Sequence, residues 1–290
     1  MTTASDWVQG ARPRTLPAAA APVLVGTGAA AQLGEADLGR GALALGVALA
    51  LQVGVNYAND YSDGIRGTDV DRVGPMRLTA SGSASPGTVK AAAFAAFGVA
   101  GLFGLALVYV SGYWWLLGVG VIAIAAAWGY TGGKNPYGYL GLGEVGVFTF
   151  FGLVAVLGTT YTQADELSWP AWVGAVSVGM LACALLMANN LRDIPTDALV
   201  GKRTLAVRLG DRLARRAYAG LVILPVLLGG IVCAFASPWA LLVLLLLAPA
   251  VILAVTVLLG ARGRALVPVL AGTGLLELGF GVLLGLGLAL

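Results

Sequence analysis

Charged residues are scarce in this chain: they make up 11% of its 290 residues, whereas hydrophobic residues make up 59%. A soluble domain carries charge on about a quarter of its residues. The mean hydropathy of +0.89 is strongly positive as well. Together these values exclude a soluble globular protein and predict an integral membrane protein.

Histidine is absent, and the chain has only two cysteines, Cys183 and Cys233. The lack of histidine removes the commonest general base and any Ser–His or Cys–His nucleophile pair. Both cysteines fall in apolar runs without a nearby metal-ligand partner, so neither a zinc site nor a disulfide framework is indicated. The net charge of +3 is too small to favour nucleic acid. Anionic lipids or a phosphorylated substrate are better candidates.

Long apolar runs recur along the whole sequence. A bilayer core of roughly 30 Å needs about 20 helical residues, so the runs predict an all-α polytopic membrane protein, with nine transmembrane helices in a single domain over residues 1–290. The first sixteen residues are polar and are expected to be retained on the membrane surface. The predicted spans are 16–33, 41–60, 88–110, 113–130, 140–162, 171–191, 214–236, 238–259 and 266–288.

The basic residues predict the orientation of these spans. Every Lys and Arg except Arg40 falls in the N-terminal segment, in the second, fourth, sixth or eighth loop, or in the first three residues of the span that follows such a loop. Because basic loops stay in the cytoplasm, the N-terminus is predicted to lie inside the cell and the C-terminus outside. Bases such as Arg262 and Arg264 are interpreted as markers of the cytoplasmic edge.

Two polar segments, 56–71 and 189–204, interrupt the apolar pattern at the cytoplasmic ends of predicted helices. The first segment contains Asn56, Asn59, Asp60 and Asp63. The second contains Asn189, Asn190, Asp193 and Asp197. Within each segment the spacing puts these side chains on one face of a helix. Acidic clusters at the ends of membrane helices are costly, so they indicate a functional site.

Carboxylates gathered this closely repel one another unless a positive charge lies between them. Oxygen ligands without His or Cys select Mg²⁺ or Mn²⁺ over zinc, and Mg²⁺ binds through one or two carboxylates plus substrate phosphate oxygens. The two segments therefore predict a diphosphate bridged by metal. The bases predicted to bind this diphosphate are Arg66, Arg77, Lys134, Lys202 and Arg203.

These motifs resemble the UbiA superfamily of intramembrane aromatic prenyltransferases over essentially the whole chain. The second family pattern, DxxxD, is similar to Asp193 and Asp197, and residues 77–82 resemble the family's RPLxSG. Tyr130 and Lys134, with the threonine between them, resemble its Tyr-Ser…Lys element.

The first family pattern, NDxxDxxxD, is similar to the segment that begins at Asn59. The pattern departs from the family at Gly67, where an acid is expected, and Asp69 or Asp71 could take that role. The resemblance implies Asp60, Asp63, Asp193 and Asp197 as catalytic residues and Mg²⁺ as the cofactor. It implies as metal ligands Asn59, Asp60, Asp63, Asp69, Asp193 and Asp197.

Within the superfamily, residues 59–69, 141–144 and 189–206 resemble the members that act on 1,4-dihydroxy-2-naphthoate. This resemblance implies a helical bundle around a central cavity in a bacterial plasma membrane, with the polar motifs at the cytoplasmic side. The implied partners are polyprenyl diphosphate, 1,4-dihydroxy-2-naphthoate and membrane lipid. The implied reaction is Mg²⁺-dependent prenyl transfer with decarboxylation, which gives demethylmenaquinol.

Several interpretations stay open from the sequence. Glu144 could orient the acceptor or act at a helix N-terminus, and Glu277 could line the cavity or pair with a polar group. The residues predicted to line the acceptor or cation site are Asn56, Tyr61, Tyr130, Glu144 and Asn190. Another aromatic acceptor is the main alternative for function. An anion transporter or a CDP-alcohol phosphotransferase is a weaker one.

Overall fold

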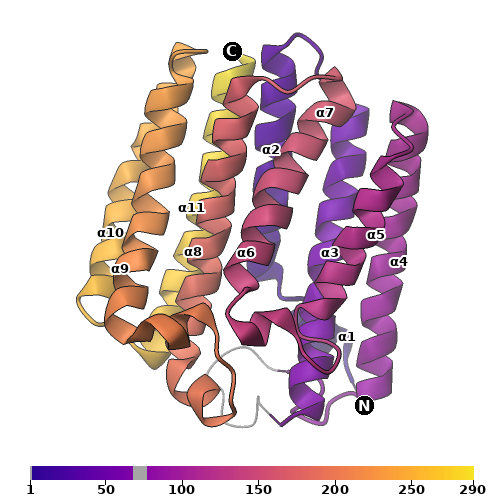
Figure 1. The fold of residues 1–290 in the computed structure, drawn as a ribbon, viewed down its shortest axis with the longest axis vertical. Helices are drawn as coiled ribbons and strands as arrows, with labels where there is room; N and C mark the ends of the chain where they lie inside the picture. Colours follow the sequence, from indigo (N-terminus) through magenta and orange to yellow (C-terminus); the bar gives the residue numbers. More distant parts are fainter. Residues whose placement is uncertain (1, 68–76) are drawn as a thin grey trace.

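The computed structural model describes residues 2–67 and 77–290. Helices dominate these residues and no β-strand occurs among them, which confirms the predicted all-α fold. The long helices run side by side along one axis, and the two termini lie at opposite ends of the bundle (Figure 1).

A helical segment lies at each of the apolar runs that the sequence predicts. Short 3-10 or π-helical stretches continue several of them, so that α6, η3 and α7 form one span, as do α9 with η4 and η5 with α10. In chain order the elements are α1 (Ala4–Ala11), η1 (Pro13–Thr15), α2 (Leu16–Gln32), α3 (Leu38–Ile65), α4 (Pro86–Ser111), α5 (Leu116–Gly129), η2 (Tyr137–Leu140), α6 (Gly143–Val147), η3 (Phe148–Leu157), α7 (Gly158–Ala164), α8 (Trp169–Leu199), α9 (Leu205–Leu227), η4 (Leu228–Val232), η5 (Pro238–Leu246), α10 (Leu247–Leu258), η6 (Gly263–Ala265) and α11 (Leu266–Ala289).

Seven helices among the described residues are long and apolar enough to cross a membrane, which makes the chain a multi-pass membrane protein. Two predicted spans are shorter. The 14 residues of α5 rise only about 21 Å, and the 17 residues of α2 rise about 26 Å. Both fall below a hydrocarbon core of about 30 Å, so the predicted count of nine full-length spans is not confirmed.

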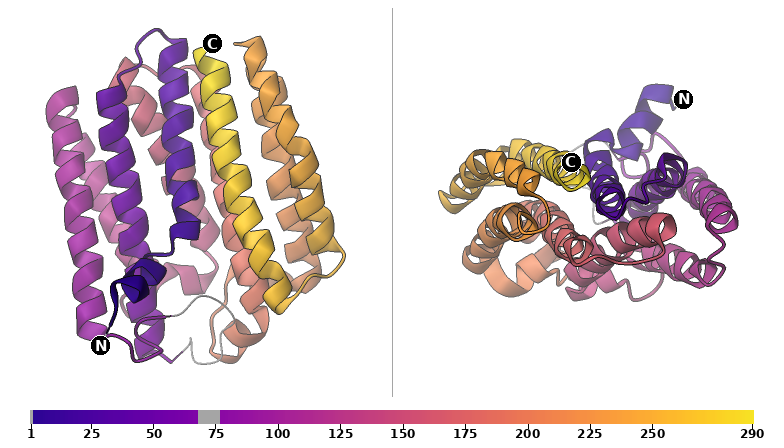
Figure 2. Two further views of the ribbon diagram at one scale, coloured as in Figure 1. Left: turned by 180° about the vertical axis from the view of Figure 1, so that it is seen from behind. Right: turned by 90° about the horizontal axis from the view of Figure 1, so that it is seen from above.

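Glycines let the first membrane helix, α2, pack directly against the last, α11. A Cβ atom at Gly28 would lie 2.2 Å from the carbonyl oxygen of Gly285, and one at Gly281 would lie 2.7 Å from the Cα of Ala21. Small residues at such contacts let helix backbones approach closely in lipid. Figure 2 shows α2 and α11 side by side in both views.

The buried core is unevenly distributed among the helices. Its largest cluster includes residues of α8, α9, α10 and α11, whereas α5 has no buried residue. Large apolar side chains such as Leu102, Val121 and Ile122 are exposed on α4 and α5. Because lipid is as apolar as these side chains, such exposure suits a helix that faces the bilayer.

Helices α3 and α8 extend beyond the predicted spans 41–60 and 171–191 and include most of both polar segments. Helix α3 continues to Ile65 and ends before Gly67, whose φ of +70° favours glycine. Helix α8 continues to Leu199 although Pro195 lies inside it. The polar side chains of both segments are therefore held on regular helix.

Candidate active site

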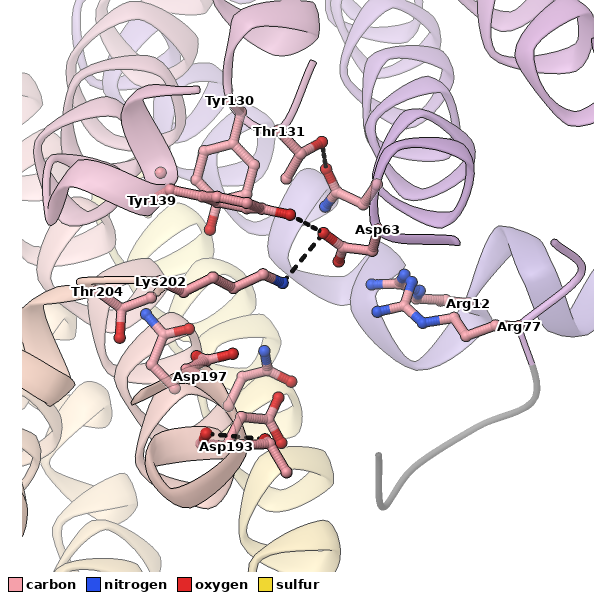
Figure 3. Close-up of a pocket in the computed structure, with 15 residues that line it drawn as sticks. Arg12, Asp63, Arg77, Tyr130, Thr131, Tyr139, Asp193, Asp197, Lys202 and Thr204 are labelled. Carbon is pink, nitrogen blue, oxygen red and sulfur yellow. Dashed lines mark hydrogen bonds and ion pairs between the residues drawn. The ribbon is translucent and has the colours of Figure 1, made fainter. Parts of the chain in front are cut away.

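A polar pocket of about 60 Å³ lies where the ends of α3 and α8 meet the loops after α5 and α8. It can hold several water-sized groups. Figure 3 shows its side chains converging from these separate elements. The lining residues are Arg12, Asn59, Asp63, Arg77, Tyr130, Thr131, Gly138, Tyr139, Asn189, Asn190, Asp193, Thr196, Asp197, Lys202 and Thr204.

Asp63, from the last turn of α3, forms a buried ion pair with Lys202. The Lys202 Nζ lies 3.0 Å from Asp63 Oδ1, and the Tyr139 hydroxyl donates a hydrogen bond to the same oxygen. The ammonium group also lies 4.6 Å from the centre of the Tyr139 ring. A turn after α8, closed by the Lys202 N–H bond to the Asp197 carbonyl at 2.9 Å, brings the lysine back to α3. Two distant segments thus form one wall.

Asp193, on α8, is held by the neighbouring guanidinium. Arg192 donates to both Asp193 carboxylate oxygens at 2.7 Å, and its Nη2 also donates to Asn189 Oδ1 at 2.9 Å. Such bidentate, charge-assisted pairs are short and fix geometry. Arg192 was not singled out from the sequence, because the motif pattern begins at Asp193 and does not include the residue before it.

The loop after α5 is attached to α3 by Asn59 and Arg66. The Thr131 hydroxyl donates to Asn59 Oδ1 at 2.7 Å. The Arg66 guanidinium donates to the carbonyl oxygens of Thr131 and Gly133, so this base holds the loop and does not line the pocket. Tyr130, which directly precedes Thr131, contributes its ring to the pocket lining.

The loop ends on η2, whose first residue is Tyr137. Its ring packs edge-on against Tyr130 with the centroids 5.5 Å apart. Burial raises the pKa of Tyr137 to about 12, so its hydroxyl stays protonated at neutral pH.

Asp60 is turned away from the pocket and holds the residues that follow Arg77. Its two carboxylate oxygens accept hydrogen bonds from the backbone N–H groups of Leu78 and Thr79, each at 2.8 Å. The side chain is almost completely buried, at 1% exposure. Asp60 is also absent from the pocket lining. In the present geometry it instead helps to place Arg77 in the lining.

Several other predicted residues lie outside the pocket lining. Asn56 donates hydrogen bonds to the N-terminal segment. The Tyr61 ring stacks on that of Trp128, with the ring centroids 6.0 Å apart. Lys134 and Arg203 are exposed. Asp69 and the neighbouring Asp71 lie outside the described residues.

Glu144 is not part of the pocket lining, but it contacts the lining residue Asn190. Its Oε1 accepts a hydrogen bond from Asn190 Nδ2 at 3.3 Å, and its Oε2 has no partner among residues 2–67 and 77–290. The N-cap of α6 is Leu142, so Glu144 does not cap this helix. Glu277 lies outside the pocket lining. It is fully buried in α11, and neither carboxylate oxygen has a partner in the described part of the chain.

The donor set of the pocket fits a hard divalent cation. Asp63, Asp193 and Asp197 offer carboxylate oxygens, and Asn59 and Asn189 offer carboxamides. No group of three or more His, Cys, Asp or Glu residues is close enough to hold a metal alone, within the ranges that the structure describes. This arrangement suits Mg²⁺, which usually completes its coordination with water and substrate phosphate oxygens.

The sequence predicted most of the acids and missed other lining residues. It identified Asp63, Asp193, Asp197 and Lys202, which the fold brings together. Arg12 and Tyr139 were missed because they lie outside both polar segments, and no spacing in the sequence points to either. Only the contacts between distant segments of the folded chain identify these two residues as part of the pocket.

The fold and pocket define a multi-pass membrane protein with a pocket at one end that is lined by acids and bases. The chain belongs to the UbiA prenyltransferase family, whose model matches residues 19–287. It is therefore a prenyltransferase.

Relatives of this chain are similar over most of their length. A protein of Mycobacterium tuberculosis described as 1,4-dihydroxy-2-naphthoate octaprenyltransferase is 54% identical over 275 residues, which cover 95% of this chain and 94% of that protein. A protein of Escherichia coli with the same description is 42% identical, covering 78% of this chain and 74% of its own.

The fold is similar to that of solved structures. The structure of a UbiA homologue from Archaeoglobus fulgidus bound to DMAPP and Mg²⁺ superposes with a TM-score of 0.68 and covers 98% of both chains. Its sequence is 15% identical, so this likeness supports the fold alone.

Proposed function

We propose that this protein transfers a polyprenyl chain from prenyl diphosphate to 1,4-dihydroxy-2-naphthoate, with loss of the acceptor's carboxylate, to give demethylmenaquinol. The observation that carries the proposal is the pocket in which Asp63 faces Asp193 and Asp197, with Lys202 and Arg77 in the same lining. The printed descriptions of the relatives supply the acceptor.

In this proposal, Asn59, Asp63, Asp193 and Asp197 hold Mg²⁺ through their side-chain oxygens. When bound, Mg²⁺ supplies the positive charge that neutralises the diphosphate and stabilises it as a leaving group. Lys202 and Arg77 add fixed positive charge at the same place. Preorganised charge in a water-poor site stabilises developing negative charge strongly, so leaving-group departure is where these bases act.

The carbon skeleton reacts by electrophilic aromatic substitution. The bond between the allylic carbon and the diphosphate oxygen breaks, and the ring carbon that bears the carboxylate forms a bond to the allylic carbon. Carbon dioxide then leaves and the ring regains its aromaticity. Because carbon dioxide departs in place of a proton, the substitution needs no general base, in agreement with a chain that contains no histidine.

The side chains around the pocket protect the allylic cation and orient the acceptor. The rings of Tyr130 and Tyr139 line the pocket, and an aromatic face stabilises a desolvated cation by about 2 kcal/mol. Glu144, whose Oε2 has no partner among the described residues, accepts a hydrogen bond from an acceptor hydroxyl. Asn190 keeps that carboxyl in place at 3.3 Å.

The test is mass spectrometry of the products that purified protein makes from one isotope-labelled polyprenyl diphosphate and a panel of aromatic acceptors. The expected product from 1,4-dihydroxy-2-naphthoate has gained the prenyl group and lost the mass of carbon dioxide. Product from another aromatic carboxylate alone would refute the acceptor. Full activity in excess EDTA would refute the metal requirement.

A further inference from the structure

Arg12 has a backbone conformation that is unusual for its residue type. Its φ of 54° and ψ of 69° lie in the left-handed region, where the only other non-glycine residue with positive φ in the described ranges is Asp165. A side chain at such a position is disfavoured by contacts with its own backbone. The surroundings must therefore impose the conformation, and imposed strain often marks a functional site.

A buried asparagine of α3 holds the chain on both sides of Arg12. The Asn56 Nδ2 donates to the Ala11 carbonyl at 2.8 Å and to Thr15 Oγ1 at 3.0 Å. The Thr15 hydroxyl in turn donates to the Arg12 carbonyl at 2.9 Å. Gln52, one turn earlier on α3, donates to the same hydroxyl at 3.0 Å. These bonds fix where α1 ends and where Arg12 points.

The Arg12 guanidinium extends into the pocket beside that of Arg77, opposite Asp63 (Figure 3). The Arg12 Nη2 is buried and has no hydrogen-bond partner within the described residues. A buried donor without a partner is costly, and two adjacent guanidinium groups repel each other. A ligand with several anionic oxygens would satisfy both requirements.

We propose that Arg12 binds the diphosphate of the prenyl donor and that Asn56 is the positioning residue that directs it there. This inference rests on the proposed function. A diphosphate carries enough oxygens to make two kinds of contact at the same time. Some of its oxygens can bind the metal held by Asp63 and Asp193, while others accept hydrogen bonds from the guanidinium groups of Arg12 and Arg77. A single carboxylate, such as that of the acceptor, cannot make both.

The test measures binding of inorganic pyrophosphate with Mg²⁺ to purified protein by calorimetry, without turnover. Arg12→Gln should weaken binding about 10- to 100-fold, since it removes a charge-assisted hydrogen bond. Arg14→Gln is the matched control, because Arg14 is exposed two residues away and absent from the lining. It should bind as the wild type does. Equal affinity of the two variants would overturn the role of Arg12.

Arg12→Gly separates binding from folding. Glycine adopts this φ without strain, so the variant should unfold at the same temperature as the wild type or higher and still lose pyrophosphate affinity. A variant with lost affinity and a clearly lower unfolding temperature would indicate a structural role instead and would count against the proposal.

The positioning role of Asn56 is tested by a double-mutant cycle. Asn56→Leu should weaken pyrophosphate binding in the wild-type background and add nothing in Arg12→Gln, because both changes remove the same contact. Additive losses of affinity would overturn the proposal that Asn56 acts through Arg12.

The same measurements separate this inference from the proposed function. If the protein did not transfer a prenyl group while Arg12→Gln still lost pyrophosphate affinity, only the proposed function would be refuted. If Arg12→Gln changed only the KM for the aromatic acceptor, the assignment of Arg12 to the diphosphate would be refuted.

Discussion

Two carboxylates of the pocket have basic partners at close range: Asp63 pairs with Lys202, and Asp193 pairs with Arg192. Breaking a buried pair leaves an uncompensated charge and is costly. A metal or a diphosphate that enters therefore meets carboxylates and bases that already interact with one another. Changes at the acids and at the bases should thus affect binding of the same substrate.

Removing the charge of a pocket acid should reduce turnover strongly. Asp63→Asn and Asp193→Asn should each lower kcat at least about 100-fold, since each removes a metal ligand or its charge. Asp211→Asn is the control, because Asp211 pairs with Arg215 outside the pocket. Initial rates at saturating Mg²⁺ measure the effect. A wild-type rate for Asp193→Asn would contradict the metal assignment.

The lysine of the pocket should matter for one substrate only. Lys202→Gln should lower kcat/KM for prenyl diphosphate about 10- to 100-fold, as expected for loss of a charge-assisted hydrogen bond. Arg262→Gln should have little effect, because its side chain is 77% exposed and lies against Asp211. Steady-state kinetics with each substrate varied in turn provide the measurement. Equally mild effects of both variants would mean that Lys202, like Arg262, only marks the cytoplasmic edge of the membrane.

At the scale of elements, the stripe that the sequence predicts on α3 divides into two ridges. Residues four apart lie about 40° apart around a helix, whereas residues three apart lie about 60° apart in the opposite sense. Asn56 and Asp60 form one ridge, which binds the N-terminal segment and the turn at residues 78–79. Asn59 and Asp63 form the other, which lines the pocket. The spacing shows a shared face but not the partner that each ridge meets.

Helix boundaries could be predicted only in part. The apolar runs gave the positions of the spans, because burial in lipid depends on composition. The ends of α3 and α8 were placed several residues too early, since hydropathy falls at polar residues while backbone hydrogen bonding continues. Arg12 could not be found, because its place depends on contacts of Asn56 on α3 with Ala11 and Thr15, which lie 45 and 41 residues away in the sequence.

Close packing of α2 on α11 should make small substitutions costly. Gly28→Ala should destabilise the protein by about 1–3 kcal/mol through overpacking, because its Cβ would lie 2.2 Å from the Gly285 carbonyl oxygen. Gly118→Ala on α5 meets nothing within 4 Å and should be neutral or stabilising by up to about 1 kcal/mol. Thermal unfolding in detergent compares the two. A lower unfolding temperature for Gly118→Ala alone would contradict this packing argument.

At the scale of the whole molecule, the two ends of the bundle should be reached from opposite sides of the membrane. In a background of Cys183→Ala and Cys233→Ala, a cysteine at Glu166 should react with an impermeant thiol reagent in intact cells. A cysteine at Lys134, exposed at the pocket end, should react only after permeabilisation. Both positions are exposed in loops, so access is not limited by burial. The reverse pattern would place the pocket outside the cell.

The contact between α2 and α11 also sets an order in time. During synthesis, α2 enters the membrane while α11, more than 230 residues later, is not yet made. The small-residue surface of α2 at Ala21 and Gly28 therefore has no partner until the last helix is inserted. Contacts between such distant segments form late in folding. The contact that joins α2 to α11 therefore forms only after α11 has been made, and until then lipid covers that surface of α2.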